Sequence, residues 1–249
     1  MTGEKKPMVE YALEYARRGW RVFPLSGKIP LKNSHGFEDA TTDEMTIRSW
    51  WNDNPMYNIG IATGRSSGGL VVLDLDRKNG KDGYKALVEW QIQNRLSRPF
   101  PDTVKAVSGT GGEHWYYQMP ECYLDSRIDI LNGIDSRANK GYIVAPPSIH
   151  PETGEPYQWG DNHGPEEVKL AEITPEILLL LTSEGNYRQS ADKAEPRDRF
   201  RLPEIIEQGQ RDDTIFRYAC QMRSQGIAEE EIQERVRSAN DQRCRPPGL

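Results

Sequence analysis

The sequence lacks the features that mark membrane, secreted and disulfide-stabilised proteins. No apolar run in its 249 residues approaches the roughly 18 residues of a membrane-spanning helix, so a membrane span is excluded. Residues 1–7 contain no apolar stretch of the kind found in signal peptides. The three cysteines are scattered and odd in number, which predicts neither a disulfide framework nor a cysteine-rich zinc site. A reducing cytoplasm is therefore the expected location.

An excess of positive charge is also lacking, since 38 acidic residues against 32 lysines and arginines give a formal net charge of −6 at pH 7. That balance argues against a general nucleic-acid-binding surface but allows a local basic groove. Basic residues outnumber acidic ones between residues 5 and 32. Lys28, Lys32 and His35 lie in a long polar loop predicted over residues 25–40, and loops of that length are usually functional or disordered. These side chains are candidates to contact a phosphate backbone, and an ordinary solvated loop is an equally good interpretation.

One apolar run, residues 70–76, predicts a buried central strand that carries two acids. Successive side chains of a strand point to opposite faces, so Asp74 and Asp76 share one face with Val72. Two carboxylates so placed raise each other's pKa unless a positive charge lies between them. Mg²⁺ is a common counter-charge, because it takes one or two carboxylates and completes its shell with water and phosphate oxygens. The alternative is two solvated acids that lead into a turn.

A glycine-rich turn follows the strand predicted at residues 103–108. Residues 108–112, Ser-Gly-Thr-Gly-Gly, should expose several backbone N–H groups, and such concave turns bind anions such as phosphate. The spacing is neither a P-loop nor a dinucleotide fingerprint, because no Gly-Lys-Ser/Thr follows and the next residues begin a strand. His114 starts that strand. Its imidazole either faces the turn or has a structural role, and the sequence favours neither.

A third acid, Asp135, is predicted to end an apolar strand, and Arg137 and Lys140 follow closely. Acids that hold a metal ion, together with cations that neutralise phosphate oxygens, are what a nucleotide site requires. Glycines inside the strand predicted at residues 58–64 indicate the close approach of a ligand or another backbone, or a simple bulge.

The remaining patterns alternate between helices and strands. Trp50 and Trp51 are expected to pack in the core at the end of a helix that a capping box, Thr41 with Glu44, begins. Further helices are predicted at residues 7–18, 82–96 and 174–181, and further strands at residues 20–24, 142–145 and 157–159.

The composition predicts two domains. Residues 1–182 carry all the patterns described so far, and residues 183–201 are polar and aperiodic, which predicts a linker. Two helical patterns at residues 212–225 and 228–244 predict a small helical bundle within residues 202–249, with Met222, Ile232 and Val236 facing inward.

The motifs follow one another in a specific order. They are Lys28-x-Pro30, Asn58-Ile59-Gly60-Ile61-x-Thr63-Gly64, Asp74-x-Asp76, Ser108-Gly109-x-Gly111-Gly112-x-His114, Gly133-Ile134-Asp135-x-Arg137 and Gly141-Tyr142-x-Val144-Ala145-Pro146-Pro147-Ser148. Together they resemble the N-terminal primase–polymerase (prim-pol) domain of the archaeo-eukaryotic primase superfamily. The stretch from Gly209-x-Arg211 to Pro246-Pro247 is similar to the helical primase C-terminal domain that often follows it.

The resemblance implies an α+β fold with an RRM-like catalytic sheet joined to a smaller α/β module, followed by a C-terminal α-helical bundle. It implies that Asp74, Asp76 and Asp135 hold two divalent ions, Mg²⁺ or Mn²⁺. No zinc is expected, because the interval that carries a zinc stem in some relatives contains only Cys122. The residues implied to bind the incoming nucleotide's triphosphate are Ser108, Gly111, Gly112 and His114, with Arg137 and Lys140 as further phosphate contacts by position.

The implied activity is template-directed nucleotidyl transfer from NTPs or dNTPs, to start and extend primers on single-stranded DNA in plasmid or phage replication. Lys28 and Lys32 are expected to contact template phosphates or the 5′ nucleotide of a primer. A replicative helicase is a further implied partner, although the chain has no Walker-type motif of its own. The alternatives are a repair-type polymerase that only extends ends, and a non-catalytic single-strand-binding module. A nuclease would use similar acids without needing the glycine turn and the histidine.

Overall fold

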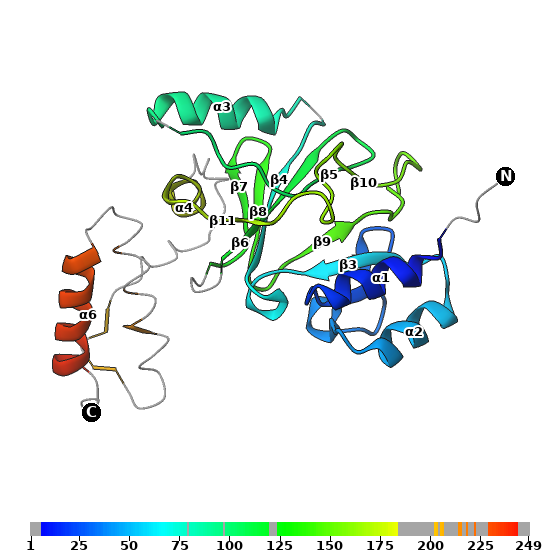
Figure 1. Cartoon of the computed structure of the whole chain (residues 1–249), viewed down its shortest axis with the longest axis horizontal. Coiled ribbons are helices and arrows are strands. Elements are labelled where there is room, and N and C mark those ends of the chain that lie inside the picture. Colours follow the sequence, from blue (N-terminus) through cyan, green and yellow to red (C-terminus); the bar gives the residue numbers. More distant parts are fainter. Residues whose placement is uncertain are drawn as a thin grey trace, which may run out of the picture. The chain divides into compact units, whose positions relative to one another are not determined.

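The computed structural model describes residues 6–78, 80–96, 98–119 and 124–183, together with residues 202–203, 205–206, 214–215, 218, 222 and 229–243. The chain divides into two compact units, Met1–Asn186 and Tyr187–Leu249. The first unit is α+β and built on antiparallel sheets, and the described part of the second contains the helix α6 (Glu229–Arg243) (Figure 1). No helix in the described part of the chain is long and apolar enough to cross a membrane.

Two sheets form the first unit. The smaller has the order β2-β1-β3-β9, from β2 (Ile29–Pro30), β1 (Val22–Ser26), β3 (Asn58–Ala62) and β9 (Tyr142–Ala145). The larger has the order β10-β5-β6-β4-β8-β7, from β10 (Gln158–Trp159), β5 (Lys105–Val107), β6 (Glu113–Gln118), β4 (Leu70–Leu75), β8 (Ile134–Arg137) and β7 (Arg127–Leu131). A further strand, β11 (Ala171–Glu172), pairs with β6 in parallel.

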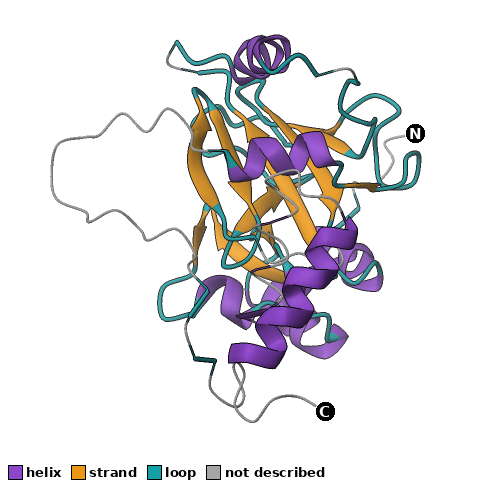
Figure 2. Ribbon diagram, turned by 90° about the vertical axis from the view of Figure 1, so that its left-hand side faces the viewer, coloured by secondary structure: helices purple, strands orange, loops and turns teal. Residues whose placement is uncertain are grey.

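Helices cover these sheets, and Figure 2 shows the strands in the middle of the first unit with its helices around them. The helices α1 (Met8–Arg17) and α2 (Glu44–Asp53) contact each other and the smaller sheet, whereas α3 (Gly83–Gln93) contacts β7 and β8. A fourth helix, α4 (Pro175–Thr182), packs in the same core as α3. The sheets share a core with α1 and α2, and its members include Val22, Ile59, Ile143, Val72, Ala106 and Tyr116.

The strand β4 lies at the centre of the larger sheet, between β6 and β8, as its apolar run predicts. Val71, Leu73 and Leu75 pack in the core beside α3 and α4, whereas Val72 packs in the core shared by the two sheets. Asp74 therefore lies on the Val72 face, which confirms the alternation expected from the sequence. The acids consequently face the smaller sheet.

Most of the predicted elements are confirmed, including α1, α4 with its capping residue Thr174, β9 and the edge strand β10. Trp51 is buried in the shared core, as expected. The loop predicted over residues 25–40 is more structured than expected, since it holds β2 and a 3₁₀ turn at Gly36–Asp39.

The predicted capping box of α2 is wrong. The capping residue is Asp43, whose side chain accepts a hydrogen bond from the Thr46 N–H at 2.8 Å. Thr41 instead pairs with Val22 through backbone hydrogen bonds in both directions, so it forms a bridge beside the start of β1 rather than starting a helix. Asp and Thr are both good capping residues, and the strand pairing of Thr41 decides between them.

The position predicted for Asp135 also needs correction. The sequence placed it at the end of one apolar strand, but β7 and β8 form a hairpin, and Asp135 is the second residue of β8. Asn132 and Gly133 form the connection, with a φ of 80° at Gly133. Asn-Gly is the strongest short hairpin signal because both positions tolerate positive φ. The turn was therefore visible in the sequence and was missed.

The glycines of the β3 region accommodate protein atoms. A Cβ at Gly60 would lie 2.7 Å from the ring of Phe23. Gly64 has a φ of 81°, and a Cβ there would lie 2.7 Å from backbone atoms of Asn139. The close approach of another backbone, one of the alternatives that the sequence left open, is observed at Gly64, whereas the neighbour of Gly60 is a side-chain ring.

We expect Gly64→Ala to destabilise the first unit by at least about 2 kcal/mol, because it adds both positive-φ strain and a clash with backbone. Urea unfolding midpoints measure this loss. Gly68→Ala is the matched control, since Gly68 has a φ of 67° but nothing within 4 Å of its Cβ position. It should show only the strain, about 1 kcal/mol. Equal losses in the two variants would contradict the close-approach interpretation.

In the second unit, Met222 and Ile232 are buried and Val236 is half-buried, as predicted. The backbone N–H of Ile206 donates to Arg243 O at 2.7 Å, and Arg243 Nη1 donates to Leu202 O at 3.0 Å, so Leu202 and Ile206 are both bonded to the last residue of α6. Apart from Ser183, the linker predicted at residues 183–201 lies outside the described residues, and so does most of the helix predicted at residues 212–225.

Candidate active site

Three side chains selected from the sequence lie in one row across the larger sheet. Asp74 on β4 is the direct register partner of His114 on β6 and of Asp135 on β8. Directly opposed residues of neighbouring strands point to the same face, so the three side chains are neighbours. Asp76 follows two residues further along, just beyond the end of β4. We call His114, Asp74 and Asp135 the His–Asp–Asp row, which has Asp74 at its centre.

Arg137 bridges the two carboxylates of the row. It follows Asp135 by two residues on β8 and therefore lies on the same face. Its Nη2 atom is 2.9 Å from Asp135 Oδ2 and 3.6 Å from Asp74 Oδ2. The guanidinium supplies the positive charge that two adjacent carboxylates require.

Asp135 is affected both by burial and by the charges around it. Burial raises the pKa of Asp135, and the negative charge of Asp74 adds to this. A 2.8 Å hydrogen bond from the Asp129 N–H to Asp135 Oδ1, together with the charge of Arg137, opposes the rise. The site therefore holds negative charge in a partly buried place, where a further cation would be favoured.

His114 is buried, and its Nε2 atom lies 3.6 Å from Asp74 Oδ1. Burial lowers the pKa of His114, and the charges of Arg137 and Lys28 act in the same direction against the charge of Asp74. The ring is therefore neutral at pH 7. It offers a ligand one N–H donor rather than a positive charge.

Lys28 joins the site from the smaller sheet. It is half-buried in the turn between β1 and β2. Burial lowers the pKa of Lys28, as does the charge of Lys78, while Glu152, Asp74 and Asp76 oppose this. Lys78 Nζ itself lies 3.8 Å from Asp76 Oδ1. Lys28 therefore lies close enough for the charges of Asp74 and Asp76 to act on its pKa. Its position in a loop predicted from the sequence did not indicate this proximity.

Two of the selected lysines are not brought to the row. Lys32 and Lys140 are exposed, and Lys140 lies in the turn between β8 and β9 with a φ of 58°. Neither is among the charges that shift the pKa of His114 or of Asp135.

The glycine-rich turn at residues 108–112 uses part of its own hydrogen-bonding capacity. The Ser108 N–H donates to Gly112 O at 2.8 Å, and the Gly111 N–H donates to Ser108 O at 2.9 Å. Within the described residues, the N–H groups of Gly109, Thr110 and Gly112 make no backbone hydrogen bond of this kind. These three groups remain as donors for an anion.

Close contacts fix where this turn lies. A Cβ at Gly112 would be 2.9 Å from Leu75 O, at the end of β4, so a larger residue would push the turn away from the acids. A Cβ at Gly109 would be 2.8 Å from the Cβ of His150. Glycine at both positions brings the turn against the end of β4 on one side and the loop after β9 on the other.

Two aromatic residues of this neighbourhood were not selected from the sequence. Tyr157 was predicted only as part of an edge strand, and His150 was not considered. The ring centroid of Tyr157 lies 5.6 Å from that of His114 and 5.8 Å from that of His150. A histidine soon after the paired prolines that end β9 was the only available signal, and by itself it indicates no function.

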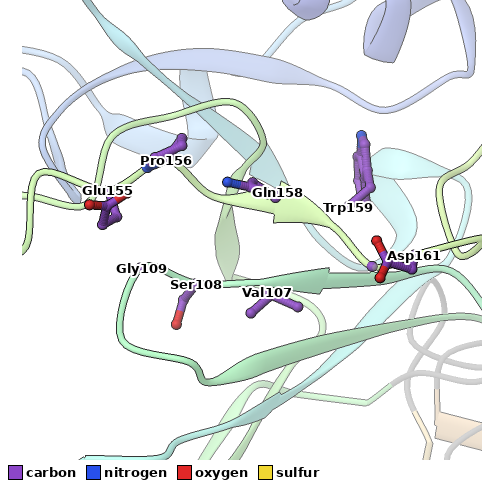
Figure 3. A pocket seen from close by; sticks show the side chains of 9 residues that line it. Val107, Ser108, Gly109, Glu155, Pro156, Gln158, Trp159 and Asp161 are labelled. Carbon is purple, nitrogen blue, oxygen red and sulfur yellow. The ribbon is translucent and has the colours of Figure 1, made fainter.

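A hollow of about 330 Å³ lies beside the glycine turn, between β5, β10 and the loop before β10 (Figure 3). Its lining includes Ser108, Gly109, Glu155, Gln158 and Asp161. Acids without a lysine or arginine line it, so it does not suit a phosphate group.

The acids of the site fit a hard divalent cation in their chemistry, because Mg²⁺ and Mn²⁺ prefer carboxylate oxygens. In the described part of the chain, however, no three His, Cys, Asp or Glu side chains are arranged to hold a metal ion. Arg137 lies between Asp74 and Asp135, so a cation that binds both must displace at least one of its contacts.

The sequence matches the Prim-Pol family, described as "Bifunctional DNA primase/polymerase, N-terminal", over residues 12–176. Residues 202–247 match the family "Primase C terminal 1 (PriCT-1)". No curated protein matches the chain. Because the first match covers more than half of the sequence, the chain belongs to the Prim-Pol family, and the resemblance inferred from its motifs is confirmed. The two matches give the chain the general role of a primase/polymerase family, whose members bind DNA and nucleotides.

Proposed function

We propose that this chain is a DNA primase-polymerase that transfers nucleotides from NTPs or dNTPs onto a growing primer on single-stranded DNA. The observation that carries the proposal is the His–Asp–Asp row beside a glycine turn with free N–H groups. Acids on β4 and β8, together with anion donors in a turn that lies against the end of β4, suit a triphosphate and its metal. Replication of a plasmid or phage is the proposed context, with a replicative helicase as a partner.

In the proposed reaction, Asp74, Asp76 and Asp135 hold the divalent ions, two Mg²⁺ or Mn²⁺. Bound there, these ions would favour loss of the 3′-hydroxyl proton and neutralise the triphosphate. Arg137 holds the two carboxylates together in the free protein and turns to the phosphates when nucleotide binds. Lys28, half-buried beside the acids, neutralises further phosphate charge.

The triphosphate binds at the glycine turn and at His114. The free N–H groups of the turn donate to phosphate oxygens, and the neutral His114 ring adds one more donor. Ser108, Gly111 and Gly112 shape the turn. Lys140 is the weakest candidate phosphate contact, because it is exposed and apart from the row.

The finer architecture forms part of the proposal. We infer that the larger sheet is an RRM-like catalytic sheet and that the smaller sheet with α1 and α2 is the accessory α/β module. The second unit would be an α-helical bundle with α6 as one of its members. The proposed domains are residues 1–182 and 202–249, joined by residues 183–201.

The direct test is synthesis on unprimed single-stranded DNA, with labelled NTPs and dNTPs in parallel and with Mg²⁺ and Mn²⁺ in parallel. Products of two or more nucleotides that disappear in the double variant Asp74→Ala/Asp76→Ala would support the proposal. Extension of a supplied primer without unprimed synthesis would favour a repair-type polymerase. Template binding with neither activity would favour a non-catalytic single-strand-binding module.

We expect Lys28→Ala and Lys32→Ala each to lower the salt dependence of template binding, because each removes a proposed phosphate contact. One lost contact should reduce the slope of log K against log salt by about 0.7 for a single strand. Fluorescence anisotropy at several salt concentrations measures it. Lys85→Ala is the control, since Lys85 is an exposed lysine on α3 that pairs with Glu89. An unchanged slope in both test variants would remove these residues from the template path.

A further inference from the structure

No hydrogen bond holds the His114 ring in place among the described residues. Its Nδ1 atom is buried without a partner there, and its Nε2 atom is 3.6 Å from Asp74, longer than a hydrogen bond. Functional histidines are commonly oriented by a hydrogen bond to the second ring nitrogen. The orientation of His114 must therefore come from packing.

The ring packed against His114 is that of Tyr157. The two planes are inclined by 35° at a centroid distance of 5.6 Å, and both residues are buried. Tyr157 makes a second contact of the same kind with the fully buried His150, at 5.8 Å and 33°. One tyrosine ring thus contacts both histidines.

Tyr157 is itself firmly held. Its N–H donates to Ser148 O at 2.7 Å, and its ring belongs to a core with Phe23, Leu25 and Val144 of the smaller sheet. His150 is fixed by a 2.8 Å hydrogen bond from its N–H to Glu155 O. Its burial, together with its contact on Tyr157, limits the movement of the tyrosine ring.

The loop that carries these two rings connects the sheets. Asn58 of β3 donates to Ile149 O at 2.7 Å and accepts from the Ile149 N–H at 2.9 Å. On its other side the same loop touches the glycine turn, because His150 lies against Gly109. A ring fixed to this loop therefore has a defined position relative to both the smaller sheet and the proposed phosphate site.

We propose that Tyr157, supported by His150, is a positioning residue that orients the His114 ring toward the phosphates of the bound nucleotide. The inference rests on the proposed function. The aromatic ring of Tyr157 is the part that orients His114, because the two residues contact each other through their rings. Burial raises the pKa of Tyr157, so its hydroxyl is uncharged throughout the working range of pH.

The test compares Tyr157→Leu, which removes the ring, with Tyr157→Phe, which keeps it. The dissociation constant of a dNTP in Mg²⁺, from isothermal titration calorimetry, is measured alongside KM and kcat on a primed template. We expect Tyr157→Leu to weaken nucleotide binding and raise KM about tenfold while kcat at saturating nucleotide stays within a few-fold, as for a binding group held too loosely. Tyr157→Phe should retain most of the wild-type affinity for the nucleotide.

A double-mutant cycle shows whether Tyr157 acts through His114. If it does, Tyr157→Leu should add little to the loss already caused by His114→Ala. Tyr117→Leu is the matched control, because Tyr117 is equally buried on the opposite face of the larger sheet. It should lower the melting temperature without changing nucleotide affinity. If Tyr157→Leu does not fold, His150→Leu replaces it in the same cycle, since it removes the support of the ring.

Additive effects in the cycle, or unchanged nucleotide affinity in Tyr157→Leu or in the His150→Leu variant that replaces it, would overturn the inference. A Tyr157→Phe variant as weak as Tyr157→Leu would also overturn it, because the hydroxyl and not the ring would then matter. Each of these three results can be obtained only if the wild-type protein binds nucleotide. Absence of any nucleotide binding by the wild type contradicts the proposed function itself and is thereby distinguished from a failure of the positioning role.

Discussion

Replacing Asp74 by asparagine is expected to lower nucleotide incorporation at least about a thousandfold, the scale on which the loss of electrostatic stabilisation lowers turnover. Asp74 lies at the centre of the row, opposite both His114 and Asp135. Asparagine keeps the shape of the side chain but removes the charge that a metal ligand supplies. Incorporation of a labelled nucleotide into a primed template, measured over hours, has the sensitivity to detect this loss.

The fold should survive this change. Asp74 is partly exposed, and its charge acts against the ionised form of Asp135, so neutralising it relieves repulsion between the two acids. Asp129→Asn is the matched control, because its side chain pairs with Lys81 outside the row and its backbone N–H to Asp135 is kept by the change. The charge of Asp129 also raises the pKa of Asp135, but less than that of Asp74 does. Full activity in Asp74→Asn would contradict the assignment, and equal losses in both variants would show that the effect is not specific to the row.

The acid at the centre of the site was predictable because it depends on local rules. Strand alternation places Asp74 and Val72 on one face, and an apolar run that long makes β4 central. The place of the glycine turn and of His114 along the chain was predictable in the same way, since they follow the end of one strand and begin the next, but the direction of the His114 ring was not. None of these requires knowledge of which strands become neighbours.

The parts that were missed depend on pairing between distant segments. The alignment of Asp135 beside Asp74 is set by the register of β8 on β4, and β8 exists as a separate strand only because the chain turns back after β7. Lys28 meets the acids only because the smaller sheet packs on the larger. Tyr157 reaches His114 through a loop anchored on both sheets. Such contacts between remote segments leave no periodic signal in the sequence.

His114→Ala is expected to raise the KM for nucleotide about 10- to 100-fold, which is the loss of one hydrogen bond to a charged group. The ring is neutral, so it contributes a donor to the phosphates and no proton to the reaction. The rate at saturating nucleotide should therefore stay much closer to that of the wild type than in Asp74→Asn. Initial rates over a wide range of nucleotide concentration separate KM from kcat.

A matched control for this change is His163→Ala. His163 is partly exposed and is bound to Asp102 at 2.9 Å, and neither residue belongs to the row. Its replacement should leave KM unchanged. Because His114 is buried, its alanine variant should also lose some stability, so its melting temperature must be shown to lie above the assay temperature. A lower kcat with unchanged KM would reassign His114 from nucleotide binding to the chemical step, since only an interaction made in the transition state alone behaves in that way.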